Sequence, residues 1–178
     1  MQIRFLTVCA SLALLALIAC AQLAPAATPI SGRTVTLDLD EGTWMSLDIS
    51  PDGKTIAFDL LNDIYILPAD GGMATAIHRG SATQRSPQFS PDGQSLVYLS
   101  DETGADNVWV SRTDGSQPRQ VTHETHAYVA GPAWSPDGRS IAAVISYSDI
   151  FRVRNSEIRK YSLDGSRDEL IVEPRESG

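Results

Sequence analysis

The tetrapeptide Ser-Pro-Asp-Gly occurs three times in this chain, each time between two apolar segments. Its aspartates are Asp52, Asp92 and Asp137, so the copies are 40 and 45 residues apart. Proline and glycine supply the backbone angles of a tight turn, and aspartate bonds locally to the backbone. Each copy therefore predicts a turn between two antiparallel strands. A repeat of this length is typical of one four-stranded blade of a β-propeller.

The segments around the turns predict four strands in each repeat. The first strands are expected at 47–50, 87–90 and 132–135, and the second at 56–58, 96–98 and 141–145. The third are expected at 64–67, 108–110 and 158–163, and the outer ones at 74–77, 119–122 and 169–172. Asp-Gly pairs, typical of hairpins, separate the third and outer strands. The distance from the motif aspartate to this pair grows from 18 to 22 and 27 residues, which predicts a longer loop between the second and third strands in each successive blade.

We therefore expect an all-β chain: a partial β-propeller of three four-stranded antiparallel blades after an N-terminal signal segment. The expected domains are a signal peptide (1–27), a leading strand and linker (28–43), blade 1 (44–80), blade 2 (81–124), blade 3 (125–172) and a tail (173–178). Residues 33–40 alternate between apolar and polar, as in a half-buried strand. Propellers close with four to eight blades, so three repeats predict an incomplete ring. The chain would then be part of a longer protein, a truncated product, or a half that pairs with a second copy.

The N-terminus predicts export from the cytoplasm. Arg4 precedes an uncharged, mostly apolar stretch at 5–19, and small residues follow at 24–27, which is the pattern of a cleavable signal peptide. The stretch is shorter than the roughly 20 residues of a membrane span. The expected location is periplasmic or secreted. The alternative is a lipid anchor on Cys20, because residues 17–20 resemble the lipobox of exported bacterial lipoproteins.

The charge of the chain limits its partners. The formal net charge is −8, which argues against nucleic acids and anionic membranes as partners. The expected partner is a protein, or a missing C-terminal domain, bound through a face of the propeller. Open blade edges also predict self-association, because an unpaired strand edge is a template for pairing.

The histidines are the first candidates for chemistry. His123 and His126 are three residues apart with Glu124 between them, whereas the zinc-protease signature needs two histidines four apart on a helix. We interpret this segment as a solvated loop. His78 is expected to end the outer strand of blade 1 without a special role.

Other site patterns are weaker still. The oxygen-rich segment 101–107 has the composition of a calcium loop but not its full ligand pattern, and a polar hairpin tip is the favoured interpretation. The sequence contains neither Gly-x-Ser-x-Gly nor His-x-His. We therefore assign no catalytic, cofactor-binding or metal-ligating residue, and expect no cofactor in this chain. The residues singled out are structural ones of the repeated turn: Ser50, Pro51, Asp52, Gly53, Ser90, Pro91, Asp92, Gly93, Ser135, Pro136, Asp137 and Gly138. Trp109 and Trp134 are expected to pack between blades.

The repeats, over about 43–172, resemble the TolB-type, WD-like β-propeller family. More narrowly, segments 41–53 and 58–65 resemble the propeller that precedes the metal-dependent catalytic barrel of exported amidohydrolases. This resemblance implies the noncatalytic propeller portion of an exported amidohydrolase-like hydrolase, with the catalytic barrel absent from this chain. The alternatives are a TolB-like periplasmic protein-binding module and the gating propeller of an exported peptidase.

Overall fold

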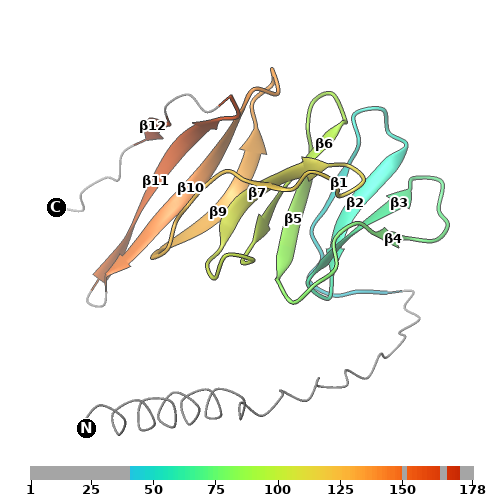
Figure 1. Ribbon diagram of the computed structural model, residues 1–178, viewed down its shortest axis with the longest axis horizontal. Coiled ribbons are helices and arrows are strands. Elements are labelled where there is room, and N and C mark those ends of the chain that lie inside the picture. The colour runs from blue at the N-terminus through green and yellow to red at the C-terminus, as the bar shows by residue number, and fades with distance from the viewer. Residues whose placement is uncertain (1–40, 150–151, 165–167, 173–178) are drawn as a thin grey trace, which may run out of the picture. The chain divides into compact units, whose positions relative to one another are not determined.

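The computed structural model describes residues 41–149, 152–164 and 168–172 (Figure 1). The predicted signal segment, Cys20, the leading strand at 33–40 and the tail at 173–178 lie outside these residues. Twelve strands and no helix occur in the described part of the chain. The strands are β1 (Leu47–Ile49), β2 (Thr55–Leu60), β3 (Asp63–Pro68), β4 (Thr75–Ala76), β5 (Gln84–Phe89), β6 (Ser95–Ser100), β7 (Asn107–Arg112), β8 (Arg119–Gln120), β9 (Ala127–Trp134), β10 (Ser140–Asp149), β11 (Arg152–Ser162) and β12 (Glu169–Val172).

The strands form three separate sheets, each made of four consecutive antiparallel strands. Blade 1 is β1-β2-β3-β4, blade 2 is β5-β6-β7-β8 and blade 3 is β9-β10-β11-β12. The predicted fold class, a partial propeller of three four-stranded blades, is confirmed. Figure 1 shows the blades following one another in chain order, with blade 2 in the middle.

The prediction of a longer loop in each successive blade is wrong for blade 3. In blade 2 the extra residues do form the connection between β6 and β7, at 101–106. In blade 3 they lengthen the two strands instead, because β10 and β11 have 10 and 11 residues where their counterparts in blades 1 and 2 have six. Residues that keep pairing across the hairpin, such as Tyr147 with Asn155, satisfy their backbone groups in the ladder rather than in a loop.

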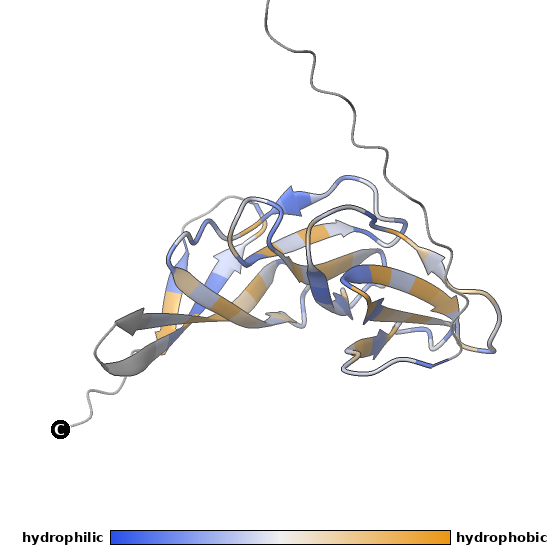
Figure 2. Cartoon of the chain, turned by 90° about the horizontal axis from the view of Figure 1, so that it is seen from below, coloured by the Kyte–Doolittle hydropathy of each residue, from blue (hydrophilic) through white to orange (hydrophobic). Residues whose placement is uncertain are grey.

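The apolar core lies between the blades rather than inside any one of them. In β6, Leu96 and Tyr98 pack towards blade 1, whereas Val97 and Leu99 pack towards blade 3. This follows from strand geometry, since successive side chains point to opposite faces of a sheet. Figure 2 shows the resulting apolar colouring along the strands. Blade 2 is therefore buried on both faces, and each neighbouring blade on one.

The three repeated turns have the same internal hydrogen bonds. The serine Oγ donates to Oδ1 of the aspartate at 2.6 Å in the first two copies and 2.5 Å in the third. The same Oδ1 accepts the backbone N–H two residues after the aspartate, at 3.0–3.1 Å. Both bonds lower the pKa of Asp52, Asp92 and Asp137 below the ordinary value, and the bond from the serine has the larger effect. The turn aspartates are thus held in the ionised form.

Gly115, in the hairpin between β7 and β8, lies where blade 2 approaches blade 1. Its φ is +81°, and a Cβ at this position would clash with the carbonyl oxygen of Ile77. Gly53, in the first repeated turn, has a similar φ of +72° but no atom within 4 Å of the same added Cβ. Comparing substitutions at Gly115 and Gly53 therefore separates the free-energy cost of the positive φ from that of the contact between the blades.

We predict that Gly115→Ala destabilises the fold more than Gly53→Ala. The positive φ alone costs about 1–2 kcal/mol in either variant. At Gly115 the backbone clash adds about 1–3 kcal/mol, because blade 1 has to move away. Urea unfolding of both variants measures the difference, and equal losses of stability would contradict the close approach of the two blades.

Candidate functional site

Two carboxylates of blade 1 hold the first strand of blade 2. Asp59 is 7% exposed; its Oδ1 accepts the N–H of Ser46 at 2.8 Å and its Oδ2 that of Ser86 at 2.7 Å. Asp48 accepts the N–H of Phe89 at 2.7 Å through its Oδ2. Ser86 has a φ of +57° and lies in an irregularity of the β5–β6 pairing, which frees its N–H from the ladder. The carboxylates thus bridge two blades.

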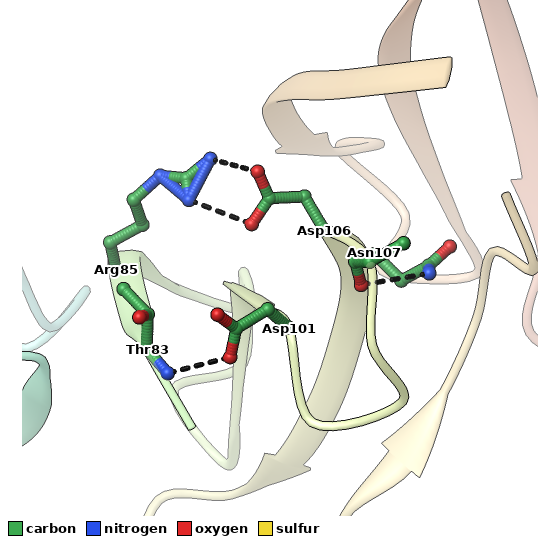
Figure 3. A network of polar contacts seen from close by, with 6 residues as sticks. Thr83, Arg85, Asp101, Asp106 and Asn107 are labelled. Atoms are coloured by element: carbon green, nitrogen blue, oxygen red, sulfur yellow. Dashed lines mark hydrogen bonds and ion pairs between the residues drawn. The ribbon is translucent and has the colours of Figure 1, made fainter. Parts of the chain in front are cut away.

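The predicted oxygen-rich tip at 101–107 is used in the same way within blade 2 (Figure 3). Asp106 accepts two bonds from the guanidinium of Arg85, at 3.0 and 2.8 Å, a bidentate ion pair. Asp101 Oδ1 accepts the backbone N–H of Thr83 at 2.7 Å. Both aspartates of this segment therefore fix the start of β5.

Asn107 ties the connection between blades 2 and 3 to β7. Its side chain is 1% exposed and makes four hydrogen bonds. The amide donates to the carbonyl oxygens of Ala105 and Glu124, and Oδ1 accepts the Oγ1–H of Thr122 and the N–H of Glu124. His123 and His126 flank this anchor and are exposed. In the described ranges, no three histidine, cysteine or acidic side chains converge as metal ligands.

His78 makes an interblade contact that the sequence did not reveal. Its Nε2 lies 3.2 Å from Ser111 Oγ, and its ring packs 5.0 Å from that of Tyr98. Ser111 Oγ also lies 2.9 Å from the carbonyl oxygen of Arg112, to which it can donate. The contact between His78 and Ser111 joins blades 1 and 2.

A cleft of about 610 Å³ opens between blades 1 and 2 on the side of the repeated turns. Apolar side chains and three carboxylates line this first cleft. The apolar ones are Ile66, Ile77 and Phe89, and the acidic ones are Asp52, Asp92 and Asp114. Asp114, like the turn aspartates, has a lowered pKa, and a hydrogen bond from Ser116 is the main cause. The cleft is suited to a side chain with an apolar stem and a cationic or hydrogen-bond-donating end.

A second cleft, of about 470 Å³, lies at the equivalent place between blades 2 and 3. Trp134, Val110 and Leu163 line it together with Asp92, Asp137 and the basic Arg119. The indole N–H of Trp134 donates to the carbonyl of Gln88 at 3.2 Å, which fixes the ring between the blades. Its lining is therefore less acidic than that of the first cleft.

All but Gly53 and Ser135 of the residues singled out from the sequence as turn residues line the two clefts. Ser50, Pro51, Asp52, Asp92 and Gly93 border the first, and residues of the second and third turns border the second. The turn motif alone does not indicate this, because the clefts exist only where two blades stack. No helix in the described residues has the length and hydrophobicity that a membrane crossing needs.

We predict that Asp59→Ala destabilises the chain by about 2–3 kcal/mol, because the N–H groups of Ser46 and Ser86 both lose a charged, buried acceptor. The exposed Asp70→Ala is the matched control and should change stability by less than about 0.5 kcal/mol. Chemical denaturation of both variants measures these values. Similar small losses would show that the Asp59 bridge contributes little.

We also predict that stability falls as pH drops below neutrality. Burial lowers the pKa of His78 from 6.5, outweighing the opposite influence of Glu102 and Asp63. The unfolded chain therefore binds a proton at a higher pH than the folded chain does, and protonation favours unfolding. Stability should decrease as pH falls through the ordinary histidine pKa and level off below the lowered one. Denaturation between about pH 7.5 and 5 measures it, and His78→Gln should flatten the curve.

Comparisons with known proteins agree with this geometry. Residues 46–178 match the family described as the Tricorn protease N-terminal beta propeller domain. Tricorn protease homolog 1 of Streptomyces coelicolor is 30% identical over 115 residues, which are 65% of this chain and 11% of that protein. The uncharacterized protein Atu1656 of Agrobacterium fabrum is 29% identical over 131 residues, 70% of this chain and 44% of that protein.

A solved structure of a TolB-like protein from Agrobacterium tumefaciens superimposes with a TM-score of 0.64 at 26% identity, covering 74% of this chain and 50% of that one. The chain spans less than half the length of the curated relatives above. The resemblance to TolB-type propellers is confirmed. The chain belongs to the family of the Tricorn protease N-terminal beta propeller domain, and its blades are TolB-like.

Proposed function

We propose that this chain is a noncatalytic, protein-binding propeller that serves an exported amidohydrolase-like hydrolase. The catalytic residues of that hydrolase lie outside the described blades. The resemblance of segments 41–53 and 58–65 to amidohydrolase-associated propellers suggests the hydrolase class. The signal-like N-terminus, with Cys20 as the alternative lipid anchor, supports a location outside the cytoplasm.

The use of the acidic residues is the observation that carries the noncatalytic role. Asp48, Asp59, Asp101 and Asp106 each accept hydrogen bonds that hold a strand or a blade in place. A general base or a metal ligand needs its carboxylate oxygens available to water, substrate or metal. In this chain the four carboxylates instead accept hydrogen bonds that hold strands and blades in place.

The clefts between the blades support a role in binding protein. Each combines apolar residues with carboxylates at the turn side of the propeller. A partner loop that inserts a lysine or arginine would place its stem on Ile66 and Phe89 and its charge near Asp52 and Asp92. This face is the one through which the propeller would hold its hydrolase.

We predict that the purified chain hydrolyses neither amide nor ester substrates, with or without added zinc. A chromogenic amide and ester series with the chain at high concentration tests this. Turnover that disappears in His123→Ala/His126→Ala would overturn the noncatalytic role, because these are the two exposed histidines closest in sequence to each other. Turnover that is unchanged in that variant and stays with the chain through a second purification would overturn the noncatalytic role as well.

A gating propeller of an exported peptidase is the second candidate. The observation in its favour is the 30% identity to Tricorn protease homolog 1. The coding sequence that follows the codon for Gly178 separates the two: His-x-His within alternating strands and helices supports the amidohydrolase, and Gly-x-Ser-x-Gly the peptidase. Further Ser-Pro-Asp-Gly copies followed by a stop codon would support a TolB-like binding module instead.

A further inference from the structure

The first cleft is an apolar groove with an acidic rim. Its apolar lining residues are buried or half-buried, and they are Ile66, Ile77 and Phe89. The carboxylates that line it belong to the exposed residues Asp52, Asp92 and Asp114. Its volume of about 610 Å³ lies within the roughly 300–1,000 Å³ of ligand pockets. Both walls of the cleft are formed by described residues of blades 1 and 2.

The three carboxylates come from three different turns, which hold them in place. The turn bonds of Asp52 and Asp92 go to Oδ1, and Oδ2 of either residue accepts no hydrogen bond from the described residues. Asp114 Oδ1 accepts the N–H of Ser116 at 2.9 Å. These hydrogen bonds lower the pKa of all three groups and keep the rim ionised. A cationic partner group therefore meets carboxylates that are already charged and oriented.

The second cleft has the equivalent place in the fold but a different charge. Its lining carries two carboxylates, of Asp92 and Asp137, and one guanidinium, of Arg119. Among the described residues, the lining of the first cleft carries three carboxylates and neither lysine nor arginine. Arg119 begins β8 as Thr75 begins β4, so blade 1 has a threonine where blade 2 has the arginine. The lining charges therefore sum to −3 in the first cleft and −1 in the second.

Two basic side chains lie near this rim without neutralising it. Lys54 contributes to the lowered pKa of Asp52, and Arg112 contributes to that of Asp92 and Asp114. Both basic residues are exposed, and neither forms an ion pair with the rim within the described part of the chain. Exposed charges that are not in contact are largely screened by water and salt. The rim therefore keeps a net negative charge towards a partner.

We propose that the first cleft binds an arginine side chain of the protein partner, in preference to lysine and in preference to the second cleft. The proposal rests on the protein-binding role above and names the residue type by which the partner is held. The arginine stem would cover Ile66 and Ile77, with its guanidinium between the carboxylates of the rim. A guanidinium has five N–H donors in a planar fork, so it can donate to carboxylates of separate turns at once. A lysine ammonium is a compact and more strongly hydrated point charge, which fits this spread of acceptors less well.

Binding of short peptides to the full chain, followed by its backbone amide NMR signals, is the first test. The probe is acetyl-Gly-Ser-Arg-Ser-Gly-amide, and the comparison peptides carry lysine or the neutral citrulline in place of the arginine. The arginine peptide should bind about tenfold more tightly than the citrulline peptide, because its hydrogen bonds to the rim are charge-assisted. The lysine peptide should bind about threefold more weakly than the arginine peptide. The amide signals of Asp52 and Asp114 should shift, and that of Asp137 should not.

Substitutions on the rim are the second test. Asp52→Asn and Asp114→Asn each remove one charge but keep an Oδ1 acceptor for the turn, and each should weaken arginine binding about fivefold. Asp70→Asn is the matched control, because Asp70 lies in the corresponding hairpin of blade 1 but does not line the cleft. Thr75→Arg places in the first cleft the charge that Arg119 has in the second, and should weaken binding about tenfold. Urea unfolding checks that each variant keeps the stability of the unsubstituted chain.

The outcomes separate this proposal from the proposed function. Arginine and citrulline peptides that bind equally would overturn arginine recognition, and lysine and arginine peptides that bind equally would overturn the preference. Equal effects of Asp70→Asn and Asp114→Asn would overturn the assignment to the first cleft. Mass spectrometry of the recovered peptides tests the noncatalytic role at the same time. A cleaved peptide contradicts that role, whereas an intact peptide that does not bind overturns only the arginine site.

Discussion

Burial of apolar side chains between neighbouring sheets is the interaction on which this fold depends. The side chains of Leu96 and Tyr98 lie on one face of β6, and those of Val97 and Leu99 lie on the other. A single strand therefore contributes to two separate cores. At about 25 cal/mol per Å² of apolar surface, this contact is the main favourable term in each interface. A single twisted four-stranded sheet offers no third layer to cover these faces. Each blade therefore depends on its neighbours for stability.

The two interfaces are held in different ways. Between blades 1 and 2, directional bonds add to the apolar contact: Asp48 and Asp59 hold β5, and His78 contacts Ser111 in β7. Between blades 2 and 3 the contact is mainly apolar, with the indole N–H of Trp134 as a polar exception. Hydrogen bonds to carboxylates and to an imidazole depend strongly on distance and angle, whereas apolar packing tolerates small shifts. The first interface is the more strictly oriented of the two.

The repeat made most of the fold predictable. The three turns, the Asp-Gly hairpins and the alternation of residues gave twelve strands in the right order, because turn chemistry and periodicity are local properties. The site was less predictable. The bond between His78 and Ser111 joins residues 33 positions apart, and Asp59 bridges to a strand that begins 25 residues later. The long hairpin of blade 3 was missed because an insertion can extend a ladder as readily as a loop.

The repeated turns also stack on one another. A Cβ at Gly93 would lie 3.4 Å from Pro51 of the preceding turn, and one at Gly138 3.8 Å from Pro91. At both junctions between described blades, the proline ring of one turn thus faces the glycine of the next. Because the same proline-to-glycine contact occurs at both junctions, it sets the same spacing between neighbouring turns even though the other contacts of the two interfaces differ.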